Sequence, residues 1–181
     1  MFSAHDLARE LRDRLPTAGN VKIHKLSYYC QGWQLAWAGE PMFPEAIEAW
    51  ANGPVVADLW RSEKRQHPTP PPQGPTGSQF AVIEYVVERY GQYSGRELIH
   101  MTHEEAPWRD ATSQTDDSSN WLNPGITHEA LLAWFSHDEK LVAHRAGVAE
   151  LRQHRHIYGF AEPAMPEYLL EATLRVLQEP G

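Results

Sequence analysis

The sequence predicts a mainly α-helical protein: a compact helical domain with at most one short strand or hairpin, followed by a C-terminal helical extension. Two observations carry this prediction. Apolar residues recur at intervals of three and four in most segments of the chain, which places them on one face of a helix. Serine residues precede several of these segments and are followed, three positions later, by an acidic residue, as at a helix N-terminus.

The first two predicted helices lie before residue 40. Ser3 and Asp6 form a capping box for a helix with a leucine at every fourth position. Asn20 is a candidate N-cap for a second helix, over residues 21–37, whose apolar residues share one face. This stripe consists of Ile23, Leu26, Cys30, Trp33 and Trp37. Such a stripe is typical of a protein core, although some of its rings could protrude to anchor a partner.

The next region combines a strand-like segment, a turn and a helix. The alternation around Ile47 indicates a short strand, and Asn52-Gly53-Pro54 is a turn sequence. We expect Pro54 in the first turn of the following helix, where the N–H group that proline lacks is not needed. A proline-rich loop over residues 66–79 comes next.

Two helices are predicted between this loop and a polar loop over residues 110–124. The first contains apolar residues at helical spacing from Phe80 and ends at Gly91. The second begins at Ser94, which forms a capping box with Glu97, and Pro107 ends it.

The chain is predicted to divide near residue 135. Residues 1–135 form the compact domain, whose last helix Thr127 caps. Residues 136–181 form the helical C-terminal extension, in which Ser136 can start a more polar helix. Three roles are open for this extension: an arm specific to one partner, a dimerisation element that would give a homo-oligomer, or a pair of covering helices.

Composition and charge narrow the function classes. The chain has 181 residues, of which 41% are hydrophobic, which argues against a disordered protein. The net charge of −8 makes nucleic-acid binding unlikely and would attract a basic partner. No stretch approaches the run of about 18 apolar residues that spans a bilayer, and no signal peptide is evident. We therefore expect a cytoplasmic protein that does not bind membranes.

The sequence contains no motif that points to catalysis or to a cofactor. His100, His103 and Glu104 have a spacing that could bring metal ligands together on a helix, but a third strong ligand and the usual metalloprotease order are missing. Cys30 lies on an apolar helix face, where burial would leave its thiol inert. No nucleophile elbow, phosphate loop or dinucleotide fingerprint is present. We expect no enzyme activity, no cofactor and no metal; a metal-dependent hydrolase is the least favoured alternative.

Four blocks of sequence, in order, resemble the Panacea domain, also called the SocA-like antitoxin domain. They are Lys25-Leu26-Ser27-Tyr28-Tyr29-Cys30-Gln31-Gly32, Gly39-Glu40-Pro41-Met42-Phe43, the segment from Ala49 to Val55, and the segment from Ser94 to Trp108. The resemblance covers about residues 3–135. The proline-rich loop is longer than the family's usual connection, and the segment after residue 135 falls outside the resemblance.

The resemblance implies a mainly helical antitoxin that is encoded beside a protein toxin in a toxin–antitoxin system of bacteria. Neutralisation in this family is thought to proceed by direct protein–protein contact, and delivery of the toxin to a protease has been proposed for some relatives. The alternative is an adaptor or regulator without a toxin, associated with a phage or with proteolysis.

Candidate residues for toxin binding are aromatic, because interfaces commonly depend on a few aromatic or arginine anchors. Our hypothesis is that at least one anchor is among Tyr29, Trp37, Trp50 and Trp60. The other residues that the family motifs single out are predicted to maintain the fold instead. These are Lys25, Tyr28, Gly53, Pro54, Thr102, His103, Glu105, Pro107 and Trp108.

Overall fold

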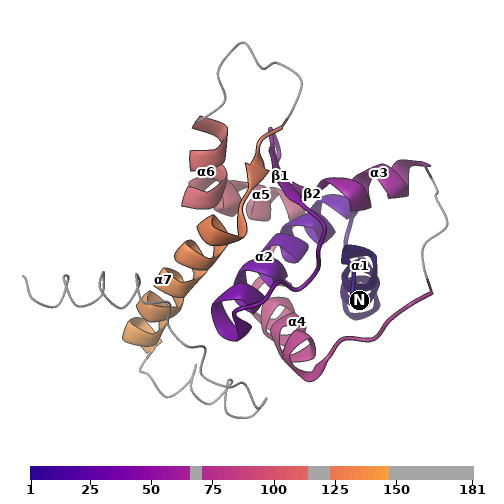
Figure 1. Ribbon diagram of the computed structural model, residues 1–181, viewed down its shortest axis with the longest axis horizontal. Helices are drawn as coiled ribbons and strands as arrows, with labels where there is room; N and C mark the ends of the chain where they lie inside the picture. The colour runs from indigo at the N-terminus through magenta and orange to yellow at the C-terminus, as the bar shows by residue number, and fades with distance from the viewer. Residues whose placement is uncertain (66–70, 114–122, 147–181) are drawn as a thin grey trace, which may run out of the picture.

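The computed structural model of the protein describes residues 1–65, 71–113 and 123–146. These residues form seven helices and three short strands (Figure 1). In chain order they are α1 (Ala4–Arg14), α2 (Asn20–Ala38), β1 (Ile47–Trp50), β2 (Gly53–Val56), α3 (Ala57–Arg65), α4 (Gly77–Tyr90), α5 (Gly95–Glu104), α6 (Ala106–Ser113), β3 (Gly125–Ile126) and α7 (His128–Ala146). The predicted mainly α-helical class is confirmed. Most of the predicted C-terminal extension, residues 147–181, lies outside the described residues.

Helix α2 is the centre of the fold, and α1, α4, α5 and α7 pack around it (Figure 1). Every residue of α2 from Ile23 to Trp37 is buried, so the helix is covered on all sides rather than along one stripe. The closest approach is made by α7. The ring of Phe135 lies against the backbone of Gly32, where an added Cβ atom would stand 2.1 Å from a ring carbon.

The three strands form a small antiparallel sheet in the order β2-β1-β3. Strands β1 and β2 make the expected hairpin, and Ile47 pairs with Ile126 of β3 on the other side. No sequence pattern predicted β3, which has only two residues. Pro54 lies in β2, opposite Ala49, so its predicted place in the first turn of a helix is wrong. As an edge strand, β2 tolerates a residue without an N–H group.

Two of the predicted helix starts need correction. Asn20 is the first residue of α2, and Gly19 occupies the N-cap position without a side-chain hydrogen bond. Helix α7 runs without a break from His128 to Ala146, so no new helix begins at Ser136. The capping boxes at Ser3 and Ser94, in contrast, are confirmed, because serine and acidic side chain bond reciprocally to the backbone in both.

The predicted loops are shorter than expected. Thr76 caps α4, which therefore begins inside the segment 66–79 that was predicted to be a loop. Pro107 lies in the first turn of α6, a position that suits proline, and this helix occupies the start of the predicted loop over 110–124. The break after α5 instead falls at Glu105, whose backbone is extended.

Candidate functional site

The family-motif residues, which are far apart in the sequence, meet around the turn between β1 and β2. The ammonium group of Lys25, on α2, donates a hydrogen bond of 2.8 Å to the carbonyl oxygen of Pro54. Gly53 has a φ of +85° and lies so close to its neighbours that an added Cβ atom would be 2.8 Å from Thr102 Oγ1 and 2.9 Å from Lys25 Cε. Only glycine combines this backbone geometry with so little space.

The Ser94–Trp108 block holds the same turn from the other side. The indole N–H of Trp108 donates to the carbonyl oxygen of Trp50 at 2.9 Å. The ring of His103 stacks on Trp108 with 3.9 Å between centroids. Strand β1 is thereby attached to both α5 and α6.

Glu105 links the same block to α2. The hydroxyl groups of Tyr28 and Tyr29 donate to its two carboxylate oxygens, at 2.6 Å and 2.9 Å. Hydrogen bonds to a charged acceptor are stronger than those between neutral groups. Two consecutive tyrosines are thus positioned by one carboxylate on the segment between α5 and α6.

Gln31 connects α2 to the Gly39–Phe43 block. Its Oε1 accepts hydrogen bonds from the backbone N–H groups of Met42 and Phe43, and its Nε2 donates to the carbonyl oxygen of Phe43. The chain after α2 is therefore fixed by a fully buried amide. All four motif blocks contact one another through side chains of α2 or through the hairpin turn.

Beside this turn lies a pocket of about 410 Å³, which we call the Trp50–Trp60 pocket. It is lined by Asn20, Val21, His24, Lys25, Trp50, Ala51, Asn52, Val55, Trp60, Glu63 and Lys64. The rings of Trp50 and Trp60 are half-buried and meet edge to face, with centroids 4.8 Å apart. Lys64 Nζ lies 4.3 Å from the centre of the Trp60 ring, and Val21, on the rim, is 47% exposed.

Buried polar groups line the inner part of this pocket. His24 is 3% exposed and Lys25 is 2% exposed. Burial lowers the pKa of Lys25 to about 7, and burial lowers the pKa of His24 to about 4 despite the nearby carboxylate of Glu63. Neither ring nitrogen of His24 makes a hydrogen bond within the described residues, and its Nε2 is 3.9 Å from Glu63 Oε2.

The structure separates the four candidate anchors into two pairs. Tyr29 and Trp37 are fully buried: Tyr29 stacks on Tyr90 at 3.9 Å, and Trp37 packs against Tyr85 at 4.7 Å. In this conformation they belong to the core, as expected of most residues in the α2 stripe, and offer no surface to a partner. Trp50 and Trp60 lie together at the Trp50–Trp60 pocket and remain candidates.

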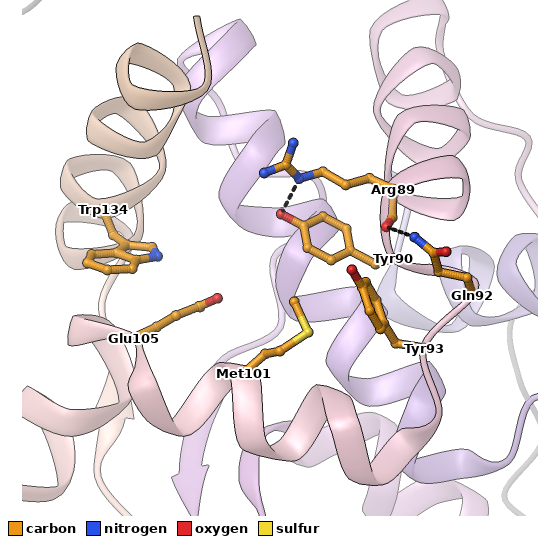
Figure 2. Close-up of a pocket in the computed structure, with 7 residues that line it drawn as sticks. All are labelled: Arg89, Tyr90, Gln92, Tyr93, Met101, Glu105 and Trp134. Carbon is orange, nitrogen blue, oxygen red and sulfur yellow. Dashed lines mark hydrogen bonds between the residues drawn. The ribbon is translucent and has the colours of Figure 1, made fainter. Parts of the chain in front are cut away.

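A second cavity, of about 450 Å³, lies on the other side of Glu105 (Figure 2). Figure 2 shows Glu105 and Trp134 on one side of it, Arg89, Tyr90, Gln92 and Tyr93 on the other, and Met101 between them. The Arg89 Nε atom donates to the hydroxyl oxygen of Tyr90 at 3.1 Å. Since Tyr28 and Tyr29 already donate to Glu105, this carboxylate serves to hold α2.

No described group of three or more His, Cys, Asp or Glu residues could hold a metal ion. The predicted trio does not converge, because His103 stacks on Trp108 while His100 and Glu104 are exposed. Burial raises the pKa of the Cys30 thiol, which keeps it protonated and unreactive. No helix in the described part of the chain has the length and apolar character needed to span a membrane.

Sequence reasoning missed His24, Glu63 and Val21 as parts of this site. A usable signal did exist: Val21, His24 and Lys25 share a helical face at spacings of three and four, so a polar patch interrupts the apolar surface of α2. Glu63 could not have been placed there from the sequence, because the position of α3 beside α2 depends on the path of the intervening hairpin.

Comparison with known proteins agrees with the resemblance described above. Residues 23–109 match the family model described as "Antitoxin SocA-like, Panacea domain". The match covers just under half of the chain and contains all four motif blocks. No curated protein and no solved structure was found to match.

Proposed function

Because the chain carries a SocA-like Panacea domain over residues 23–109, we propose that it is an antitoxin that neutralises a protein toxin by direct contact. In this proposal the toxin is encoded beside it, both proteins act in the bacterial cytoplasm, and no bond is made or broken. The observation that carries the proposal is the pair of half-buried tryptophans at the Trp50–Trp60 pocket. The family motifs contribute part of its lining, including Lys25 and Trp50, and its two tryptophan rings are not enclosed by the core.

Binding energetics support this choice of surface. A nanomolar complex corresponds to about −12 kcal/mol, and interfaces of this strength commonly bury roughly 1,600 Å². Within such an area a few residues carry most of the energy, and tryptophan is prominent among them. Trp50 and Trp60 have accessible faces, and the exposed apolar side chain of Val21 extends the surface beside them.

The net charge of −8 supports a second feature of the proposal, which concerns encounter rather than affinity. A negatively charged surface accelerates association with a positively charged protein. A toxin that acts on RNA and is therefore basic would be captured faster at low ionic strength.

The experiment that tests the function is growth rescue. The product of the adjacent reading frame should arrest growth when expressed alone, and co-expression of this chain should restore growth. The two proteins should then co-purify as a complex. Restored growth without a complex would contradict neutralisation by contact, and a complex without growth arrest or rescue would instead indicate an adaptor or regulator.

A further inference from the structure

The Lys25 ammonium lies in a buried position without an acidic partner. The acceptor of its hydrogen bond, the carbonyl oxygen of Pro54, carries no net charge, and no carboxylate of the described residues lies within ion-pair distance of Lys25 Nζ. A buried charge without a counter-charge is costly, and proteins normally pair such groups. An ammonium group in this position could instead pair with a negatively charged group of a binding partner.

The neighbouring groups cannot supply that negative charge. Among the described residues, Glu63 is the one carboxylate that lines the pocket, and its Oε1 accepts a hydrogen bond from the Arg12 guanidinium. His24, which lies beside it, is neutral at pH 7 because burial lowers its pKa to about 4. The lining of the Trp50–Trp60 pocket therefore carries two ammonium groups, those of Lys25 and Lys64, against one carboxylate that is already paired.

The walls of the pocket are apolar. Trp50 and Trp60 present ring faces and edges, and Val21 and Val55 add aliphatic groups. The combination of apolar walls and an inner cation fits a side chain with methylene groups and a terminal carboxylate.

From this juxtaposition we infer that the Trp50–Trp60 pocket binds an aspartate or glutamate side chain of the protein partner, whose carboxylate pairs with the Lys25 ammonium. This inference rests on the proposed function, in which the partner is a protein, and it adds which kind of side chain that protein inserts. The methylene groups pack against the exposed parts of Trp50 and Trp60, while Asn52 and Lys64 lie at the opening as further donors.

A basic toxin and an acidic anchor are compatible. The net charge of −8 acts over the whole surface and at long range, whereas Lys25 acts at contact. A partner with an overall positive charge that also presents one acidic residue would satisfy both. Such a requirement also excludes basic proteins that lack the acidic residue, which is a source of specificity.

The pH dependence follows from the groups that face the pocket and from Lys25 itself. The lining contributes His24 and Lys25 on α2 and Glu63 and Lys64 on α3, and Arg12 on α1 and His103 on α5 interact electrostatically with His24 and Lys25, respectively. Carboxylate binding needs the ammonium form of Lys25, whose pKa burial lowers to about 7. The affinity should therefore be highest below pH 7 and should fall by about tenfold per pH unit above it.

The test uses the full chain and a small probe, so that it does not depend on the toxin. The probe is N-acetyl-glutamate methylamide, whose side-chain carboxylate is its one charge, and the neutral control is N-acetyl-glutamine methylamide. The indole N–H resonances of ¹⁵N-labelled tryptophans are followed by NMR. We expect the glutamate probe to shift the Trp50 and Trp60 signals saturably in the millimolar range at pH 6.5, since so small a ligand cannot bind more tightly.

Variants assign the effect to Lys25. Lys25→Met should abolish the shifts, whereas Lys22→Met, a lysine on the same helix that does not line the pocket, should leave them unchanged. If Lys25→Met does not fold, the pH series on the unmodified protein decides: an affinity that stays constant between pH 6 and 8.5 overturns the inference.

Four other results would also overturn it. They are equal shifts with the glutamine probe, no shift at about 50 mM of either probe, larger shifts with N-acetyl-lysine methylamide, and concentration-dependent shifts without any probe, which would mean self-association. Growth rescue tests the antitoxin proposal independently, because the chain could still restore growth if any of these NMR results were obtained. Failure of the acidic anchor and failure of the antitoxin proposal can therefore be told apart.

Discussion

Two regions of the molecule use tryptophan, tyrosine and buried polar groups in opposite ways. Where α2 meets α7, rings pack face to edge and face to backbone, and Phe135 fits against Gly32 without space for a methyl group. At the Trp50–Trp60 pocket the rings are half-buried, and neither the ring nitrogens of His24 nor Glu63 Oε2 make a hydrogen bond within the described residues. The first region contributes stability, whereas the second retains groups that cost stability, which is typical of a functional surface.

The largest stability effect is expected in the α2–α7 contact. Gly32→Ala places a Cβ atom 2.1 Å from the Phe135 ring, and overpacking of this kind should lower the free energy of unfolding by about 3 kcal/mol. Urea denaturation measures the change. Gly77→Ala is the control, because its Cβ would meet nothing within 4 Å. In a Phe135→Ala background the cost of Gly32→Ala should shrink; an undiminished cost would show that this ring is not the obstacle.

A buried polar group that is satisfied should be costly to remove. Gln31→Leu leaves the N–H groups of Met42 and Phe43 without their acceptor, so we expect a loss of about 2–3 kcal/mol in the free energy of unfolding. Gln34→Leu provides the comparison on the same helix, because Gln34 Oε1 has no partner and its Nε2 makes one long bond of 3.4 Å. Similar losses for the two variants would contradict the role given to Gln31.

The buried lysine of the pocket should behave in the opposite sense. Lys25→Met should raise the free energy of unfolding at pH 6 by on the order of 2 kcal/mol, because removing the burial cost of the charge outweighs one hydrogen bond. The folded-state pKa of about 7 lies below the ordinary value of 10.5, so between these values the unfolded chain binds more protons and the stability of the unmodified protein rises with pH.

Denaturation at several pH values tests this sign. The advantage of Lys25→Met over the unmodified protein should shrink by about 1.4 kcal/mol per pH unit between pH 7.5 and 9. If Lys25→Met were less stable than the unmodified protein at every pH, Lys25 would maintain the fold. It would then not be one of the pocket groups that cost stability.

The smallest stability effect is expected at the pocket's aromatic wall. Trp60→Ala removes a half-buried ring and its edge-to-face contact with Trp50, which should cost about 1 kcal/mol. Thermal unfolding followed by circular dichroism measures it. A loss as large as that of Gln31→Leu would place Trp60 among the residues that hold the fold.

The sequence predicted the class of the fold and most of its helices because helical spacing and capping boxes are local signals. Ser94 and Glu97 show this directly, since their reciprocal bonds need nothing from the rest of the chain. Strand β3 and the place of Pro54 in β2 were missed, because both depend on pairing with β1 rather than on their own residues. The match over residues 23–109 likewise omits α7, although Phe135 completes the core.

The candidate site was predictable only in part. Trp50 and Trp60 were selected by residue type, but Tyr29 and Trp37 were selected by the same criterion and are buried. Residue type cannot distinguish them, because the difference arises from which helices cover α2. The inner face of the pocket, where Lys25 lacks an acidic partner among the described residues, could not be predicted without knowing where the hairpin turn lies.

In the proposed complex, the Trp50–Trp60 pocket carries most of the binding energy for the toxin. The most direct test of this claim is the dissociation constant of the purified toxin for Trp60→Ala and for Trp134→Ala, a half-buried tryptophan at the second cavity. We predict a loss of about 30-fold or more for Trp60→Ala and less than about threefold for Trp134→Ala, since a central anchor contributes at least about 2 kcal/mol. Equal affinities for the two variants, with both folded, would contradict the claim.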